Sequence, residues 1–219
     1  MYVFVTGTDT DVGKSYIAKG ICEELVKHNE TVGYLKPFQS GVIPNVLNDE
    51  ETIKSEKIKT KSSYITKTPS TPLISAEIDN VEFDLNKVVS DYEELKKECR
   101  NVIVEGSGGV YVPVKKGVLM ADVIKKLNLP TIVVARPDLG TINHTLMTID
   151  ALQNNQIKVL GIVISNYPEK TDDPVITRVK EMIEMFSCDI KVLGTIKKNQ
   201  KDFSLLTSKI IENLAMKGF

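Results

Sequence analysis

Residues 1–15, MYVFVTGTDTDVGKS, constrain the fold of this chain more than any other stretch. Residues 2–5 are β-branched or aromatic and predict a buried first strand. Residues 15–28 carry apolar side chains at every third or fourth position, which predicts an amphipathic helix. A glycine-containing loop that closes on Gly13 and Lys14 joins the two. A strand, such a loop and a helix, in that order, indicate a loop that binds the phosphates of a nucleotide, a P-loop.

The chemistry of such a loop explains its residue types. Its backbone N–H groups and the following helix N-terminus point at phosphate oxygens, while Lys14 supplies a positive charge and Ser15 a hydroxyl for Mg²⁺. The usual motif would place its first glycine at position 8, where this chain has Thr8, and the glycine stands one place earlier at Gly7. The motif is therefore a variant. The alternative is an ordinary turn that uses Gly13 only for a left-handed conformation.

Length and composition favour one domain over residues 1–219. The chain is 42% hydrophobic and has no stretch of 18 uncharged apolar residues, so we expect a full core and no membrane span. It begins directly with the first strand, without a secretory signal, which indicates the cytoplasm. A net charge of −1 gives no electrostatic reason to expect nucleic acid or an anionic membrane as a partner. The three cysteines are widely spaced and predict neither disulfides nor a metal site.

The lysine-rich segment 54–67 is the one local concentration of charge. We interpret it as a solvated helix end and loop, in preference to a binding patch. We expect residues 60–83 to form a long loop, whose length and polarity are compatible with ordering on ligand binding.

Hydrophobic runs alternate with helical patterns along the rest of the chain. Further strands are predicted at 31–36, 101–106, 130–137, 158–166 and 189–196, and further helices at 49–57, 84–99, 119–127, 142–153, 175–186 and 203–216. The second strand is expected to end at Lys36 because Pro37 cannot donate to a ladder. This alternation predicts an α/β fold of the P-loop NTPase type, with a mostly parallel central sheet and helices on both faces.

Three polar side chains at expected strand ends or loops are candidates for chemistry. Glu105 ends a strand and is followed by glycines, so its carboxylate could hold Mg²⁺. Asp49 could do the same, or could serve only as an acidic residue at a helix start. Lys36 could neutralise a substrate anion, or could be an exposed lysine before a proline. The residues alone leave the last two pairs of readings equally weighted.

Four segments in this order, GTDTDVGKS, KPFQSG, VEGSGG and LGTINH, resemble the dethiobiotin synthetases. The resemblance covers nearly the whole chain. It implies a cyclo-ligase that uses ATP, with Mg²⁺, to carboxylate diaminopelargonic acid with CO₂ and close the cyclic urea of dethiobiotin. The reaction would pass through a carbamate and a carbamic-phosphoric anhydride.

The resemblance also implies a role for each matching residue. Lys36, Lys14 and Thr10 would be catalytic, and Ser40 would join Thr10 on the carbamate. Mg²⁺ would be held by Ser15, Asp49 and Glu105. Nucleotide contacts would come from Asp11, Val12, Gly13, Lys14, Ser15, Tyr16, Asp49, Glu105, Gly106, Ser107, Gly108, Asn166 and Ile196. The substrate would be held by Ser40 and Gly109 and, across a homodimer interface, by Thr141, Ile142 and Asn143 of the partner.

Two features depart from the family pattern. Ser70 and Thr71 stand where many relatives have a Ser-Pro-His segment, and Lys197 stands where many have a proline near the base. The preference for adenine is therefore left open. The main alternative function is a dimerising switch ATPase with a deviant P-loop, but that class carries an early loop lysine where this chain has Thr8 and Asp9. A cobyrinate synthetase domain is a third reading, for which the chain lacks room for the usual glutaminase.

Overall fold

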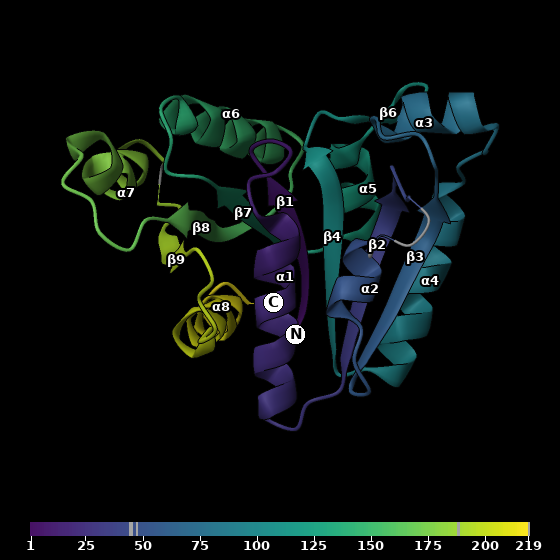
Figure 1. The fold of residues 1–219 in the computed structure, drawn as a ribbon, viewed down its shortest axis with the longest axis horizontal. Helices are drawn as coiled ribbons and strands as arrows, with labels where there is room; N and C mark the ends of the chain where they lie inside the picture. The colour runs from purple at the N-terminus through teal and green to yellow at the C-terminus, as the bar shows by residue number, and fades with distance from the viewer. Residues whose placement is uncertain (44–45, 47, 188, 219) are drawn as a thin grey trace.

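A computed structural model describes residues 1–43, 46, 48–187 and 189–218 of the chain. Within these, seven strands form one parallel sheet in the order β3-β2-β4-β1-β7-β8-β9, with a separate antiparallel pair, β5-β6 (Figure 1). The strands are β1 (Tyr2–Gly7), β2 (Val32–Gln39), β3 (Ile58–Ile65), β4 (Asn101–Gly109), β5 (Pro113–Lys115), β6 (Val118–Leu119), β7 (Thr131–Ala135), β8 (Val159–Tyr167) and β9 (Val192–Lys197).

Helices cover both faces of the sheet, as the alternating pattern predicts. They are α1 (Lys14–Lys27), α2 (Asp49–Ile53), α3 (Pro72–Asp79), α4 (Leu85–Glu98), α5 (Met120–Leu127), α6 (Thr141–Asn154), α7 (Pro174–Phe186) and α8 (Ser204–Met216). In Figure 1, α1 and α2 lie in front of the sheet and α4 and α5 behind it. The expected fold class, an α/β P-loop NTPase with a mostly parallel sheet, is confirmed.

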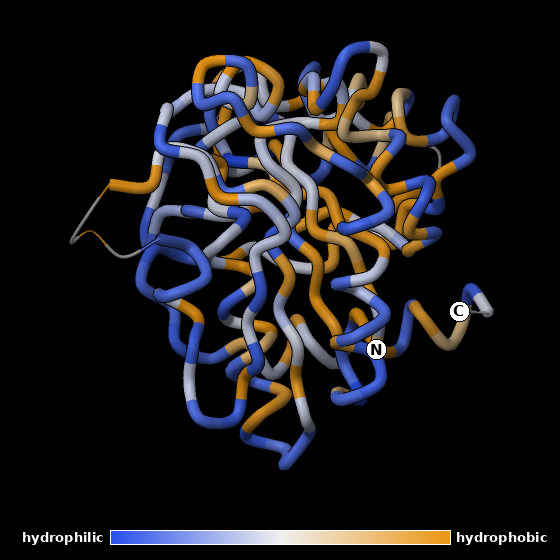
Figure 2. Tube along the Cα trace, turned by 90° about the vertical axis from the view of Figure 1, so that its right-hand side faces the viewer, coloured by the Kyte–Doolittle hydropathy of each residue, from blue (hydrophilic) through white to orange (hydrophobic). Residues whose placement is uncertain are grey.

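Each face of the sheet has its own hydrophobic cluster. One cluster packs α1, α2 and α8 against the sheet, through buried side chains such as Ile17, Ile21 and Ile210. The other packs α4, α5, α6 and α7, through side chains such as Leu95 and Ile124. Figure 2 shows the strands running as pale or orange segments through the middle of the molecule. Burial of apolar surface on both faces explains why these strands read as continuous hydrophobic runs.

The second strand is longer than the sequence predicted. β2 continues through Pro37 to Gln39, so the prediction that it ends at Lys36 is wrong. Its pairing with β4 ends at Leu35, and beyond that residue it pairs with β3 alone. Pro37 has no backbone N–H to donate, and this is tolerated because β2 no longer forms hydrogen bonds with β4 at this position.

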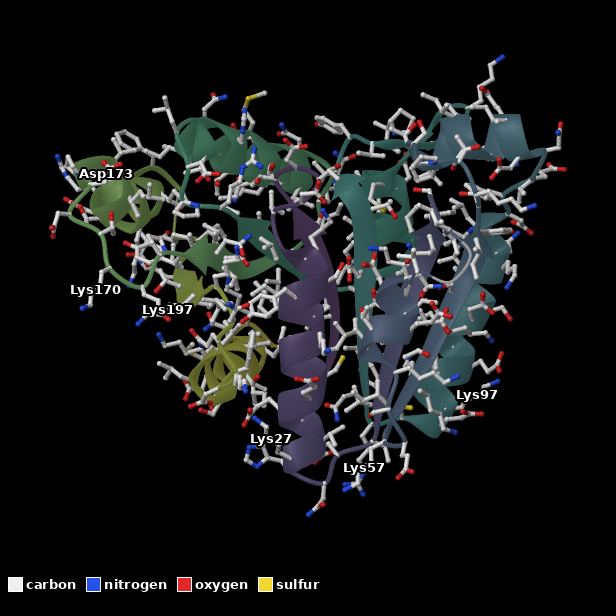
Figure 3. All side chains as sticks on the ribbon, viewed as in Figure 1. Lys27, Lys57, Lys97, Lys170, Asp173 and Lys197 are labelled. Carbon is white, nitrogen blue, oxygen red and sulfur yellow. The ribbon has the colours of Figure 1, made fainter. Side chains whose placement is uncertain are left out.

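The lysine-rich segment forms an edge strand, which corrects the predicted helix end and loop. Lys59 and Lys61 of β3 pair with acidic side chains of α4, and Lys59 Nζ lies 2.6 Å from Glu98 Oε2. The prediction of a long loop at 60–83 is also wrong, because this segment contains most of β3 and all of α3. Figure 3 labels Lys57 and Lys97, which lie at the lower end of the view, far from the P-loop at the top.

The remaining predicted elements are present with small shifts at their ends. Asp84 caps α4 by accepting a hydrogen bond from the Asn86 N–H at 2.9 Å. Cys22 and Cys99 are buried free thiols. No helix among the described residues is long and apolar enough to cross a membrane.

Candidate functional site

The loop between β1 and α1 has the backbone geometry of a phosphate cradle. Gly13 precedes α1 with φ of 98°, a left-handed conformation that glycine adopts without strain. A Cβ on Gly13 would lie 2.4 Å from Ser165 Oγ, and one on Gly7 would lie 2.7 Å from Val12 Cγ2. Both glycines are therefore required by close packing, including the displaced Gly7. Gly13 and the first residues of α1 line one cleft, and the free N–H groups of a helix N-terminus attract anions such as phosphate.

Lys14 is held over the loop that precedes it. Its Nζ donates a hydrogen bond to the carbonyl oxygen of Asp9 at 2.8 Å, and the side chain is buried. Burial lowers the pKa of Lys14 to about 8, although the nearby charge of Glu105 opposes this shift. An incoming polyanion would favour the charged form of this lysine.

Glu105 is a fully buried carboxylate at the centre of the site. It lies on β4, between β1 and β2, and is 0% exposed. Oε1 accepts hydrogen bonds from Ser15 Oγ at 2.8 Å and from Lys36 Nζ, and Oε2 accepts one from the Tyr34 hydroxyl at 2.7 Å. A buried charge requires such partners, because an unpaired one would be very costly.

Asp49 completes the cluster from α2. Its Oδ2 lies 2.8 Å from Lys36 Nζ, so Lys36 bridges two carboxylates. Asp49 is also the first residue of α2, which Asn48 and Glu51 close with a capping box. Both sequence interpretations of Asp49 are therefore compatible with its position. The exposed-lysine interpretation of Lys36 is wrong, because the residue is only 5% exposed.

The pKa values of Lys36 and Asp49 are shifted in the directions that keep both side chains ionised. Burial alone would lower the pKa of Lys36, but the carboxylates of Glu105 and Asp49 raise it overall. Burial would raise the pKa of Asp49, but the Lys36 ammonium lowers it overall. Burial, followed by the charge of Glu105, raises the pKa of Tyr34 well above its usual value, so its hydroxyl stays protonated.

The donor set suits a hard divalent cation that is shared with a nucleotide. No group of three or more His, Cys, Asp or Glu side chains gathers as a metal cage in the described residues. However, Ser15, Asp49 and Glu105 bring a hydroxyl and two carboxylates together at the P-loop. Mg²⁺ prefers oxygen ligands and is commonly held by one or two carboxylates plus phosphate oxygens and water. The residues present therefore fit Mg²⁺.

A cleft of about 720 Å³ opens over this cluster at the carboxyl edge of the sheet. Its walls come from the P-loop, the end of β2, the start of α2, the segment before α3 and the end of β4. Predicted residues that line it are Thr10, Asp11, Gly13, Lys14, Ser15, Tyr16, Lys36, Ser40, Asp49, Glu105, Ser107 and Gly108. Residues from five separated segments of the sequence thus meet around one space of the size that small ligands occupy.

Some predicted site residues lie outside this cleft. Asn166 lies beside the P-loop, with Nδ2 3.6 Å from a Cβ built on Gly13. Ile196 is 3% exposed and packs in the core, so its side chain does not face a nucleotide. The others that do not line the cleft are Val12, Gly106, Gly109, Thr141, Ile142 and Asn143.

Two contacts at the site were not predicted from the sequence. Tyr34 reaches Glu105, and Gln39 lines the cleft with a buried Oε1 that has no hydrogen-bond partner among the described residues. The register could have indicated Tyr34, because it precedes Lys36 by two residues and such residues share a strand face. Gln39 lies within the KPFQSG segment, but the resemblance gave it no role.

Comparisons with known proteins identify the family of this chain. Residues 2–201 match a family model described as an AAA domain. The chain is 39% identical over 213 residues to a protein of Methanococcus vannielii named ATP-dependent dethiobiotin synthetase BioD, covering 95% of this chain and 98% of the relative. It is 35% identical to the protein of the same name from Bacillus subtilis strain 168, covering 89% of this chain and 86% of the relative.

Solved structures show the same fold at much lower identity. The cell division ATPase MinD of Pyrococcus furiosus superimposes with a TM-score of 0.62 at 10% identity, covering 99% of both chains. The hydrogenase maturation factor HypB of Archaeoglobus fulgidus gives 0.62 at 15% identity, covering 98% of this chain and 90% of that one. These likenesses concern the fold alone. The sequence relatives are far closer, and they show that this chain belongs to the dethiobiotin synthetase family.

Proposed function

We propose that this chain is a dethiobiotin synthetase that uses Mg²⁺ and ATP to carboxylate diaminopelargonic acid with CO₂ and close the cyclic urea. The observation that carries the proposal is the convergence of Lys14, Lys36, Ser15, Asp49 and Glu105 in one cleft at the P-loop. The names of the relatives support the same activity. The cleft supplies buried positive charge where two anions, a carbamate and a triphosphate, would have to meet.

The proposed reaction has three steps. One amine of the substrate adds to CO₂ and loses a proton, which gives a carbamate. A carbamate oxygen then attacks the γ-phosphorus, the bond to the β-phosphate oxygen breaks, and ADP leaves. The second amine attacks the carbonyl carbon of the resulting carbamic-phosphoric anhydride, which closes the urea ring as phosphate leaves with the electron pair and the amine gives up a proton.

In this proposal the chain contributes charge and position more than acid–base chemistry. Lys14 and Lys36 neutralise the carbamate and the γ-phosphoryl group, and Thr10 and Ser40 orient the carbamate by hydrogen bonds. Ser15, Asp49 and Glu105 would hold Mg²⁺, which would supply positive charge next to the phosphates. Attack of one anion on another needs such neutralisation and in-line placement above all.

The adenine and the substrate tail are assigned to the parts of the site outside the cleft. Asn166 and the backbone at Ile196 would face the base, while the N–H groups of the P-loop and Gly106 would face the phosphates. The tail carboxylate would bind the N-terminus of α6 in a second copy, at Thr141–Asn143, because a helix N-terminus attracts an anion. Gly140 precedes α6 and has φ of 90°. The side chain of Leu139 is 90% exposed, which is expected of an interface residue when a chain is described without its partner.

The assembly in this proposal is a homodimer of single-domain chains, each spanning residues 1–219. Its partners are small molecules, with no nucleic acid or membrane, and its compartment is the cytoplasm. Size-exclusion chromatography with light scattering would test the dimer directly. A monomer at concentrations that support full turnover would contradict the shared site.

Turnover with defined substrates tests the activity. The purified protein with Mg-ATP and bicarbonate should release phosphate only when diaminopelargonic acid is added, with the cyclic urea seen by mass spectrometry in equal amount. Phosphate release without that substrate would favour a switch ATPase instead. Release with the substrate but without the urea would contradict ring closure, although it would leave phosphoryl transfer intact.

A further inference from the structure

Tyr34 holds one oxygen of the buried carboxylate that lies at the centre of the cleft. Its hydroxyl donates a hydrogen bond of 2.7 Å to Glu105 Oε2, and both residues are 0% exposed. The other oxygen, Oε1, faces Ser15 and Lys36, two residues of the proposed metal and substrate machinery. The two oxygens of Glu105 are therefore divided between an internal anchor and the cleft.

The position of Tyr34 is fixed by the strands and by the core. Tyr34 of β2 pairs with Ile103 of β4 in the parallel register. Ile103 precedes Glu105 by two residues on β4. The tyrosine belongs to the hydrophobic cluster beneath α1, together with Ile17 and Ile21. Close packing restricts the rotamers of such a ring, so its hydroxyl is held in place as a donor.

Without Tyr34, the Glu105 carboxylate would have hydrogen-bond partners only on its Oε1 side, which would leave its plane poorly fixed. Ser15 and Lys36 must also respond to ligands, because their polar atoms line the cleft. The Tyr34 hydroxyl lies on the other side of the carboxylate and is shielded from solvent. A partner in this position sets the plane of a ligating carboxylate and supports its affinity for a metal.

We propose that Tyr34 is a positioning residue that fixes Glu105 through Oε2, so that Oε1 is presented to the nucleotide-bound Mg²⁺. The inference rests on the proposed function, because it assumes that Glu105 serves a metal. It adds a residue that the shared sequence segments do not contain, since Tyr34 lies before KPFQSG.

Tyr34→Phe tests the proposal because it removes the hydroxyl and keeps the ring. ADP affinity would be measured by calorimetry with Mg²⁺ and with EDTA. We expect the Mg²⁺-dependent gain in ADP affinity to fall about 10-fold in Tyr34→Phe, with the EDTA affinity unchanged. Tyr92→Phe is the matched control: Tyr92 is also buried, but it lies on α4 against Tyr2, away from the cleft, and this variant should match the wild type.

The possible results distinguish a failure of the role assigned to Tyr34 from a failure of the proposed function. An unchanged Mg²⁺-dependent gain in Tyr34→Phe would overturn the role of Tyr34 and leave the proposed function standing. Equal losses with Mg²⁺ and with EDTA would also overturn it, because they would indicate general damage to the P-loop. A wild-type protein whose ADP affinity does not respond to Mg²⁺ would contradict both the metal site and this inference.

The same variant has a second readout in a double-mutant cycle. In a Glu105→Gln background, Tyr34→Phe should change the Mg²⁺-dependent gain much less than it does alone, because Tyr34 acts through that carboxylate. Additive effects of the two substitutions would contradict the proposal.

Discussion

Lys36 Nζ lies 2.8 Å from Asp49 Oδ2 and also contacts Glu105 Oε1, so one buried ammonium joins the start of α2 to the inner strand β4. Lys36 is on β2 and Glu105 on β4, and the two strands are neighbours in the sheet. The arrangement brings three charges together at the P-loop. Its consequences can be measured by removing each charge separately.

Lys36→Ala should abolish turnover while largely sparing nucleotide binding. The lysine is proposed to act on the carbamate and on charge that develops during phosphoryl transfer, whereas the P-loop holds the nucleotide. The substitution also leaves two carboxylates without their shared cation, so we expect a loss of stability of about 3 kcal/mol. Single-turnover phosphate release, ADP calorimetry and urea unfolding would measure the three effects.

Lys59→Ala is the control for that variant, because Lys59 pairs with Glu98 at the surface and lies far from the cleft. Its turnover should equal that of the wild type. A collapse of ADP affinity in Lys36→Ala would show that Lys36 serves the nucleotide and would contradict its assigned role.

Binding of ADP should take up a proton at about pH 8.5, because the pKa of Lys14 is lowered to about 8 and bound phosphates favour its charged form. Calorimetry in buffers of different ionisation enthalpy would measure the uptake. Lys14→Arg keeps its charge at this pH and should show none from position 14. Equal proton uptake by the wild type and by Lys14→Arg would show that the proton binds at a residue other than Lys14.

Lys14→Met should stabilise the nucleotide-free protein at pH 7 by roughly 1–3 kcal/mol, because the fold holds the charged form of Lys14 unfavourably. Below about pH 8 the lysine is protonated in both folded and unfolded states, so this cost is fully present. Between pH 8 and the usual lysine pKa only the unfolded state keeps the proton, so wild-type stability rises with pH and the advantage of the variant shrinks. Urea unfolding at pH 7 and 9.5 would show whether the difference narrows; a constant or growing difference would contradict the buried-charge explanation.

Gly13→Ala should damage the P-loop more than backbone strain alone would. A Cβ at Gly13 would lie 2.4 Å from Ser165 Oγ, in addition to the strain of φ at 98°. Gly117→Ala is the matched control, since Gly117 has φ of 74° but nothing within 4 Å of an added Cβ. We expect the control to lose about 1 kcal/mol of stability and to keep ADP affinity, and Gly13→Ala to lose more stability and most of its ADP affinity. Equal effects in thermal unfolding and ADP titration would show that packing against Ser165 is unimportant.

The sequence predicts those parts of the fold whose signals are local. Continuous apolar runs identify the inner strands, and the helical pattern over residues 84–99 identifies α4. Lys36 and Glu105 could be placed at the same sheet edge, because the carboxyl ends of parallel strands meet there. Their direct contact, and the bridge from Lys36 to Asp49, depend on how α2 packs on β2 and could not be read from spacing.

The elements that the sequence missed depend on contacts with distant segments. β3 lacks an apolar run, and its lysines are matched by Glu94 and Glu98 of α4, more than thirty residues away. β2 extends past Pro37 because its neighbour β4 has already stopped pairing. Tyr34 looks like an ordinary core residue until the register brings its hydroxyl to Glu105. In each case tertiary structure decided what local preference left open.

Transfer of oxygen from CO₂ to phosphate tests the central claim most directly. The protein would be mixed with Mg-ATP, diaminopelargonic acid and freshly dissolved ¹⁸O-labelled CO₂, and quenched within one turnover. If a carbamate oxygen attacks the γ-phosphorus in this cleft, the released phosphate carries one labelled oxygen and the urea carbonyl carries the other. Phosphate without label, formed together with labelled urea, would contradict a phosphorylated carbamate and the roles assigned to Lys14 and Lys36.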